Sequence, residues 1–197
     1  MIQETIDEPI EKTSNIVKIY KNLTELNIET LDLKNPIIIK ENDEIKYFCE
    51  SSNEILIQTP IVSIMKSLYD CNEMKCMNIN LQNEILSDLI LEIDNTLISK
   101  IQNNFKKWFN KKINFESILE NFIPTKLYTT EIQSYMVLSV PYENNKLNID
   151  IYNKNQELLE NPEIEINTNC TCIIQFEGIY LEKTKFYTNW KLIQLKI

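Results

Sequence analysis

The sequence of 197 residues contains no histidine, no arginine and no alanine, and its single glycine is Gly178. Ser-His-Asp and Cys-His catalysis require an imidazole, so both are excluded. Phosphate-binding loops need several glycines that bring backbone N–H groups onto the phosphates, and an arginine finger needs arginine. Paired carboxylates remain, but 29 acidic residues make any one pair uninformative. We therefore expect that the protein is not an enzyme and binds no cofactor. The alternative is a carboxylate-based hydrolase, in which two acidic side chains would face each other in a deep cleft.

The five cysteines predict reduced thiols, because their number is odd and the chain starts without a secretory signal. Two pairs, Cys71-x4-Cys76 and Cys170-x-Cys172, invite a zinc interpretation. The second pair lies on an expected strand, where its members share a face about 7 Å apart by strand rise. That spacing does not make the tight knuckle of a structural zinc site. Buried, unreactive thiols without a metal are the better interpretation.

The net charge of −9 argues against a uniformly basic nucleic-acid binder, although it leaves room for a local basic groove. Residues 1–15 are acidic and poor in apolar side chains, so we expect a flexible segment there. Residues 16–197 are expected to form a single domain. The start of the chain is not a signal peptide, and no apolar run approaches the ~20 residues that span a bilayer. We expect no membrane association.

Short β-type runs dominate both ends of the expected domain. Polar residues at Glu50–Asn53 predict a hairpin loop between two of these runs, and Asn153–Gln156 predict a turn. A last hairpin is expected from two apolar runs around Lys183–Lys185. The expected strands are Ile16–Tyr20, Ile37–Lys40, Ile45–Cys49, Ile55–Thr59, Lys75–Leu81, Tyr135–Val140, Leu147–Tyr152, Cys170–Tyr180 and Phe186–Ile197.

The period of the apolar residues changes in the middle of the chain. From Asn83 to Phe109 they recur in steps of three and four, which predicts a long amphipathic helix. Asn114 can cap a second, shorter helix that Pro124 ends. Strands followed by a helical insert at about 83–122 and further strands are typical of an OB-type fold. We expect a mainly β (α+β) domain: an OB-like barrel, closed by the last hairpin, with a long and a short helix inserted between strands.

The densest positive cluster follows the long helix, and it surrounds an aromatic pair. Ammonium groups neutralise phosphates, and ring faces stack on bases, so this combination suits a single-strand binder. Trp108 follows Phe105 by three positions, which favours a place in the core over base stacking. The lysines could equally form a solvated face or contact phosphates. The lysines of this cluster are Lys106, Lys107, Lys111 and Lys112.

Aromatic residues also recur on the expected strands. Neighbours on a strand point to opposite faces, so one member of Tyr47–Phe48 and one of Phe186–Tyr187 can face outward. The pattern leaves open which one does. Tyr47 and Tyr187 are our candidates for stacking on nucleic acid.

Three segments, taken in order, resemble a protein family of nucleocytoplasmic large DNA viruses. They are Ile55–Pro60 after an extended run, Trp108–Lys112 before a short helix that ends at Phe122-Ile-Pro124, and the closing runs Ile149–Tyr152, Cys172–Tyr180 and Phe186–Gln194. That family is similar in turn to the single-stranded-DNA-binding proteins of short-tailed bacteriophages. The resemblance implies an OB fold with a helix inserted between strands. The acidic tail of the phage proteins has no counterpart here, so the acidic N-terminal segment is the candidate for recruiting viral replication proteins.

The function that the resemblance implies is non-sequence-specific binding of single-stranded DNA in viral replication or repair. The expected nucleic-acid-binding residues are Lys106, Lys107, Trp108, Lys111, Lys112, Tyr47 and Tyr187. The expected partners are single-stranded DNA, viral replication proteins and a second copy of the chain. The expected location is the viral factory of the host cytoplasm or the nucleus, without secretion. The alternative is a virion structural or protein-interaction β-domain that does not bind nucleic acid; an unpaired strand edge would suit it.

Overall fold

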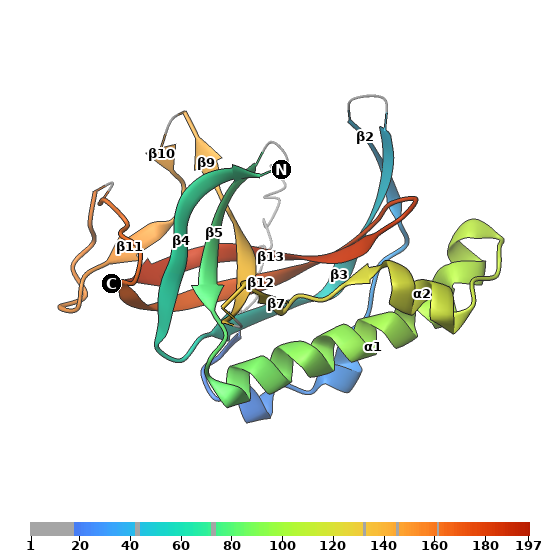
Figure 1. Ribbon diagram of the computed structural model, residues 1–197, viewed down its shortest axis with the longest axis horizontal. Helices are drawn as coiled ribbons and strands as arrows, with labels where there is room; N and C mark the ends of the chain where they lie inside the picture. Colours follow the sequence, from blue (N-terminus) through green and yellow to red (C-terminus); the bar gives the residue numbers. More distant parts are fainter. Residues whose placement is uncertain (1–17, 42–43, 72–73, 132, 145, 161) are drawn as a thin grey trace, which may run out of the picture.

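Strands form most of the ordered structure in the computed structural model, which describes residues 18–41, 44–71, 74–131, 133–144, 146–160 and 162–197. Figure 1 shows strands wound around a common centre, with one long helix lying beneath them. The acidic segment 1–15 and the first residues of the expected strand Ile16–Tyr20 lie outside the described residues.

Five strands hydrogen-bond to one another in a closed ring, in the order β12-β4-β5-β8-β13 and back to β12. The β8–β13 pairing is parallel and the others are antiparallel. The last hairpin closes the ring as expected, because β12 pairs with β4 and β13 pairs with β8. With the helices inserted between β5 and β8, the arrangement is OB-like, and the mainly β (α+β) class is confirmed. The ring strands are β4 (Val62–Cys71), β5 (Met74–Asn80), β8 (Ser134–Val140), β12 (Asn169–Leu181) and β13 (Phe186–Lys196).

The sheet continues past the ring as a wing, because β12 and β13 are longer than β4 and β8, their other partners in the ring. The strand order of the wing is β2-β3-β12-β13-β6, with β6 parallel to β13. Figure 1 shows β2 and the end of the β12–β13 hairpin on the right of the molecule. The strands outside the ring are β1 (Ile19–Tyr20), β2 (Ile37–Glu41), β3 (Glu44–Gln58), β6 (Phe122–Ile123), β7 (Leu127–Tyr128), β9 (Tyr142–Glu143), β10 (Lys146–Leu147) and β11 (Asp150–Tyr152).

The predicted hairpin loop at Glu50–Asn53 is wrong. Both flanking runs belong to the single strand β3, and both pair with β12. Glu50 lies opposite Gly178, whereas Ile55 lies opposite Phe176, so the extra residues of β3 bulge out of the ladder. The polar run therefore marks a bulge and not a reversal of the chain.

Strand β4 was absent from the sequence prediction. Its apolar residues alternate at Val62 and Ile64, both buried, but the strand then becomes polar and half-buried. The expected strand Leu147–Tyr152 is also interrupted, since Leu147 belongs to β10 and β11 begins only at Asp150. The turn at Asn153–Gln156 is confirmed by a hydrogen bond from the Gln156 N–H to the Asn153 carbonyl at 3.0 Å.

Both predicted helices are confirmed. Helix α1 (Glu84–Phe109) begins after Asn83, whose side chain accepts a hydrogen bond from the Leu86 N–H at 3.1 Å. Helix α2 (Phe115–Asn121) is capped in the same way by Asn114. Two short 3-10 helices, Leu23–Glu25 and Ile28–Thr30, contact α1. Within the described ranges, no helix has the length and apolar character required to cross a membrane.

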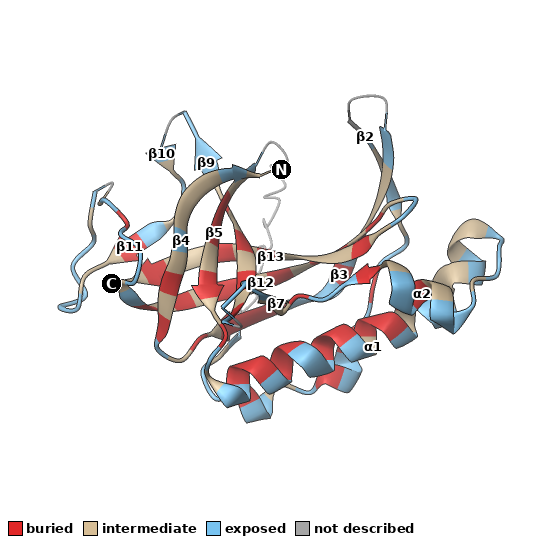
Figure 2. Cartoon of the chain, in the orientation of Figure 1, coloured by how far each residue is buried: buried red, intermediate tan, exposed pale blue. Residues whose placement is uncertain are grey.

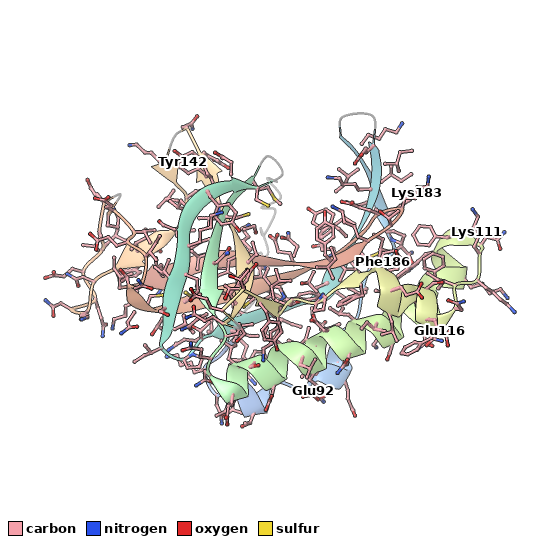
Figure 3. All side chains as sticks on the ribbon, viewed as in Figure 1. Glu92, Lys111, Glu116, Tyr142, Lys183 and Phe186 are labelled. Atoms are coloured by element: carbon pink, nitrogen blue, oxygen red, sulfur yellow. The ribbon has the colours of Figure 1, made fainter. Side chains whose placement is uncertain are left out.

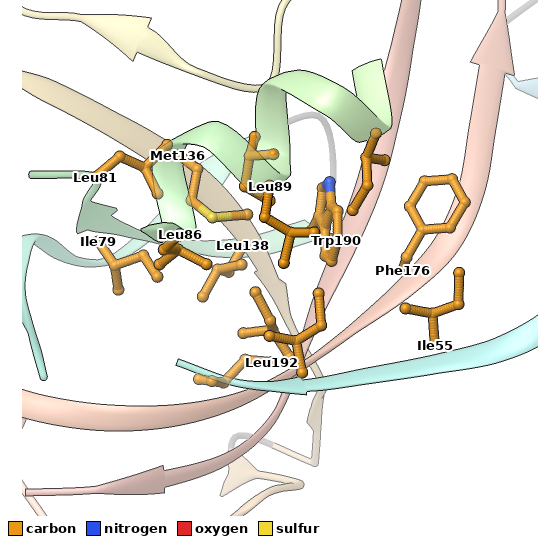
Figure 4. Packing of buried hydrophobic residues seen from close by; sticks show 14 of the residues in the cluster. Ile55, Ile79, Leu81, Leu86, Leu89, Met136, Leu138, Phe176, Trp190 and Leu192 are labelled. Atoms are coloured by element: carbon orange, nitrogen blue, oxygen red, sulfur yellow. The ribbon is translucent and has the colours of Figure 1, made fainter. Parts of the chain in front are cut away.

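The buried stripe of α1 and the inner faces of the ring strands make one hydrophobic core (Figure 2). Trp190 of β13 and Phe176 of β12 are its largest fully buried side chains, with ring centroids 5.3 Å apart. Figure 4 shows Trp190 between Phe176 and Leu89 of α1. This core holds β12 and β13 in place, so that their other faces are presented to solvent as a rigid surface.

Candidate nucleic-acid interface

Three aromatic rings form a row across the wing of the sheet. Phe48 of β3, Tyr180 of β12 and Tyr187 of β13 are directly opposite one another in register. The centroids of Phe48 and Tyr180 are 4.7 Å apart, and those of Tyr180 and Tyr187 are 5.2 Å apart with ring planes 25° from parallel. All three side chains are half-buried. The face that carries this row, turned away from α1, is called the outer face below.

Exposed apolar residues extend the row at both ends. Ile37 of β2 lies opposite Phe48 and is 59% exposed, and Ile123 of β6 lies opposite Tyr187 and is 39% exposed. The five positions therefore cross the wing from one edge to the other. Such a surface presents apolar and aromatic groups on which a planar aromatic ring can stack.

The other candidate tyrosine lies on the opposite face. Tyr47 packs edge-on against Phe109 of α1, with the ring centroids 4.9 Å apart. Its cross-strand neighbour Leu181 and the adjacent Phe186 are buried on that same face. The structure therefore separates Tyr47 from Tyr187, which the sequence pattern had grouped together.

The outer face is hollowed beside the aromatic row. A groove of about 430 Å³ is lined by Tyr142, Tyr180, Glu177, Asn189 and Lys191, among others. A second hollow of about 480 Å³ on the β3 side shares Glu177, Tyr180 and Asn189 with the first, so the two are adjacent. Figure 3 shows Tyr142 at the upper left of the molecule and Lys183, at the hairpin tip, at the upper right.

A further hollow of about 510 Å³ lies at the other end of β12 and β13. Its lining is polar and includes Gln58, Thr171, Gln194 and Lys196. The side chains that line it alternate with the buried residues of the same strands, so they belong to the outer face. The outer face is thus concave at several places along the full length of β12 and β13.

The lysines of the groove beside the aromatic row are paired with carboxylates. Lys191 lies 3.3 Å from Glu177, and Lys75 lies 2.8 Å from Asp70. The hydrogen bond to Asp70 raises the pKa of Lys75. Near the hairpin tip, the Glu182 carboxylate lies 3.2 Å from the Lys185 ammonium group. The groove is therefore close to neutral, despite the lysines that line it.

The lysine cluster of the sequence analysis lies elsewhere, at the carboxyl-terminal end of α1. Lys106, Lys107, Lys111 and Lys112 are exposed, and no ion pair within the described part of the chain involves any of them. Asn110 ends the helix in the left-handed conformation, with φ of 52°. Cations at this end of a helix are favoured by its dipole. Figure 3 shows Lys111 at the far end of the molecule, beyond α1 and away from Tyr142.

Trp108 is half-buried and belongs to an aromatic group with Phe105, Phe109 and Tyr47. This group closes the end of the core between α1 and β3. The lysine cluster and Trp108 therefore sit on the helical side, whereas Tyr187 sits on the outer face. Sequence reasoning missed Phe48 and Tyr180, and the signal for them was the adjacency of Phe48 to Tyr47 and of Tyr180 to the hairpin turn.

The cysteines are free thiols, and all but Cys71 are buried. The sulfur atoms of Cys170 and Cys172 are 3.8 Å apart, and the hydrogen bond to Cys170, followed by burial, raises the pKa of Cys172. Burial raises the pKa of Cys49 to about 12. Among the residues that the structure describes, no three or more histidine, cysteine, aspartate or glutamate side chains are grouped to hold a metal ion.

Comparisons with known proteins find structural similarity to phage proteins. The structure is similar to the single-stranded DNA-binding protein from bacteriophage Enc34 with a C-terminal truncation, at 12% identity and a TM-score of 0.46, over 86% of this chain and 95% of that one. It is also similar to the Enc34 protein in complex with single-stranded DNA, at 12% identity and a TM-score of 0.44, over 85% of this chain and 94% of that one.

No curated protein matches the sequence. One family model does match, over residues 66–197, and its description is a family of unknown function, DUF5871. The match begins within β4 and covers the helices, the rest of the ring and the last hairpin. The chain therefore belongs to the DUF5871 family of unknown function.

Proposed function

We propose that the chain binds single-stranded DNA along the outer face of β3, β12 and β13. The observation that carries the proposal is the aromatic row of Phe48, Tyr180 and Tyr187, all half-buried, beside hollows that Phe48 and Tyr180 line. Aromatic rings stack on unpaired bases at ~1–3 kcal/mol per base and tolerate every sequence, because each base has a π-face. Duplex bases are already stacked and cannot cover such a row.

The dimensions of the outer face suit a short length of strand. β12 has 13 residues, so its outer face extends roughly 40 Å at the usual rise of a strand. Phosphates would lie against the lysines along the groove, such as Lys75 and Lys191. All the basic groups are lysines, which bind phosphate as point charges. We therefore expect little sequence preference and strong weakening by salt.

The same proposal gives the lysine cluster at the end of α1 a part in binding. A strand that leaves the aromatic row past the hairpin tip would meet the cations of Lys106, Lys107, Lys111 and Lys112. We place this activity in the replication or repair of a large DNA virus, with viral replication proteins as further partners and the viral factory or nucleus of the host as the location.

The test is a titration of labelled oligo-dT by fluorescence anisotropy, in low and in high salt. The wild-type chain should bind in low salt and weaken steeply as salt rises. Tyr187→Leu should lose roughly tenfold in affinity, which is ~1.4 kcal/mol, within the range for one lost stacking contact. Tyr128→Leu is the matched control, since Tyr128 is 60% exposed on β7, lies opposite Ser134 of β8 and is not part of the aromatic row. Undetectable binding in low salt would remove the proposal.

A second function is favoured by a different observation, the edge of the wing. Among the described strands, β2 pairs only with β3, and its Ile37 and Ile38 are 59% and 60% exposed. An apolar edge strand is a template for a strand of another protein. A virion structural or interaction protein would use this edge without DNA. Stoichiometric abundance in purified virions would favour this function over the first.

A further inference from the structure

Two carboxylates bracket the aromatic row along β12. Glu177 precedes Tyr180 on the other side of the bulge at Gly178, and Glu182 follows Tyr180 toward the hairpin tip. Glu177 lines both of the adjacent hollows beside the row. These positions are where a nucleic-acid strand stacked on the row would carry its phosphates, which are also anionic oxygen acceptors.

Glu177 is fixed by two donors from β13. One of its oxygens accepts a hydrogen bond from Asn189 Nδ2 at 2.7 Å, and the other lies 3.3 Å from Lys191 Nζ. The Glu177 and Lys191 side chains are 29% and 35% exposed, so the pair is partly shielded and yet open to the groove. The carboxylate thus occupies the donors that an incoming phosphate would use.

Glu182 makes the corresponding arrangement at the tip. It accepts a hydrogen bond from Tyr187 Oη at 2.8 Å and lies 3.2 Å from Lys185 and 3.9 Å from Lys46. Its side chain is only 12% exposed. On both sides of the aromatic row along β12, a carboxylate is therefore bound to lysine.

We propose that these carboxylates are internal competitors of the DNA phosphates, and that binding exchanges the Glu177–Lys191 pair for a phosphate–Lys191 pair. The inference rests on the proposed single-stranded-DNA function and concerns the regulation of that same site. Because one anion replaces another on the same lysine, each exchange yields little net affinity. The stacking contacts then hold the strand, and the carboxylates limit affinity so that the strand can be released.

The decisive variant is Glu177→Gln, which keeps the shape and the hydrogen bond from Asn189 but removes the charge. Lys191 is then free for phosphate, and affinity for oligo-dT in low salt should rise by about threefold, the size expected for one partly exposed pair. Glu92→Gln is the matched control, because it makes the same change in net charge on the exposed side of α1, away from the outer face (Figure 3).

Glu177→Gln could raise affinity by freeing Lys191 or simply by removing a negative charge that repels DNA. The variant Lys191→Gln distinguishes these two causes. If Glu177 acts by occupying Lys191, the gain from Glu177→Gln should shrink toward the effect of Glu92→Gln when Lys191 is already replaced by glutamine. A double-mutant cycle of the four proteins measures this coupling directly. Thermal melting of each variant checks that its fold is intact.

The outcomes distinguish the inference from the function on which it rests. A gain confined to the Glu177→Gln variant and lost with Lys191→Gln supports the competition. The competition is overturned if the wild type binds and Glu177→Gln raises affinity equally with Lys191 and with Lys191→Gln. It is also overturned if Glu177→Gln raises affinity no more than Glu92→Gln does. In both cases the proposal of DNA binding is unaffected. Absence of binding by the wild type and every variant overturns the DNA function, and the competition with it.

Discussion

Gly178 shows how one residue can fix the geometry of the outer face. It has φ of 149° and lies where β12 shifts register against β3. A Cβ atom there would meet the Cys49 carbonyl oxygen and would lie 2.9 Å from the Glu50 Cα atom. The backbones of β12 and β3 can approach this closely only because the side chain is missing.

We expect Gly178→Ala to destabilise the fold by about 2–4 kcal/mol, the sum of backbone strain and overpacking against a main chain that cannot move aside. Urea denaturation measures this as a lower midpoint. Gln175→Ala, on the outer face of the same strand, is the control and should change stability by less than about 0.5 kcal/mol. A stability loss no larger than that of the control would show that β3 can shift to make room.

Asp94 is a buried carboxylate that takes part in no ion pair within the described ranges of the chain. It accepts hydrogen bonds from the Thr125 N–H at 2.8 Å and from the Thr125 hydroxyl at 2.6 Å, and it is 4% exposed. Burial is the largest influence and raises its pKa from 3.8 to about 6, although the bonds from Thr125 oppose this. Because the folded pKa lies above the unfolded one, the folded state binds the proton more tightly.

The contribution of Asp94 to the free energy of unfolding should therefore be largest below pH ~4. It should fall by up to about 3 kcal/mol as pH rises through about 6. Asp94→Asn should remove this pH dependence, because an amide does not titrate. The asparagine oxygen can still accept the hydrogen bond from the Thr125 N–H. Thermal melts between these pH values measure it, with the exposed Asp88→Asn as the control. The same slope in the Asp94→Asn variant and the wild type would contradict the assignment to Asp94.

Elements differed in how far the sequence could predict them. Helix α1 was predictable because its period of three and four is set by its own residues, and both asparagine caps act within one turn. The continuity of β3 was not, since Glu50–Asn53 has the composition of a turn and only pairing with β12 makes it a bulge. Tyr187 was predicted, but its alignment with Phe48 and Tyr180 was not, because the register between distant strands leaves no local pattern.

At the scale of the helix, Asn83→Ala should cost about 1 kcal/mol, because the Leu86 N–H loses its acceptor. Asn103→Ala has the opposite expectation, since Asn103 is exposed inside α1 and alanine has the higher helix propensity. The two variants make the same chemical change with opposite signs. Denaturant midpoints measure both, and destabilisation by both would mean that the side chain at position 103 has a role beyond propensity.

For the molecule as a whole, lysines on two surfaces differ in whether they are paired with carboxylates: those of the outer groove and those at the end of α1. The net charge is −9, yet Lys75 and Lys191 of the outer groove are paired with Asp70 and Glu177. The exposed lysines at the end of α1 form no such pairs with other described residues. Fixed acidic charge elsewhere repels a polyanion over about a Debye length. In the proposed function, the contribution of the end of α1 to DNA binding therefore depends on whether its lysines touch phosphates or only face solvent.

The salt dependence of oligo-dT binding decides between these. Each phosphate contact on a single strand adds about 0.7 to the slope of log affinity against log salt. The double variant Lys107→Gln and Lys111→Gln should lower this slope by roughly 1.4 if both lysines touch phosphate. Lys146→Gln with Lys154→Gln makes the same change in net charge at exposed positions outside the hollows, and should leave the slope unaltered. Equal slopes for the two double variants would show that the end of α1 is a solvated surface and that DNA stays on the outer face.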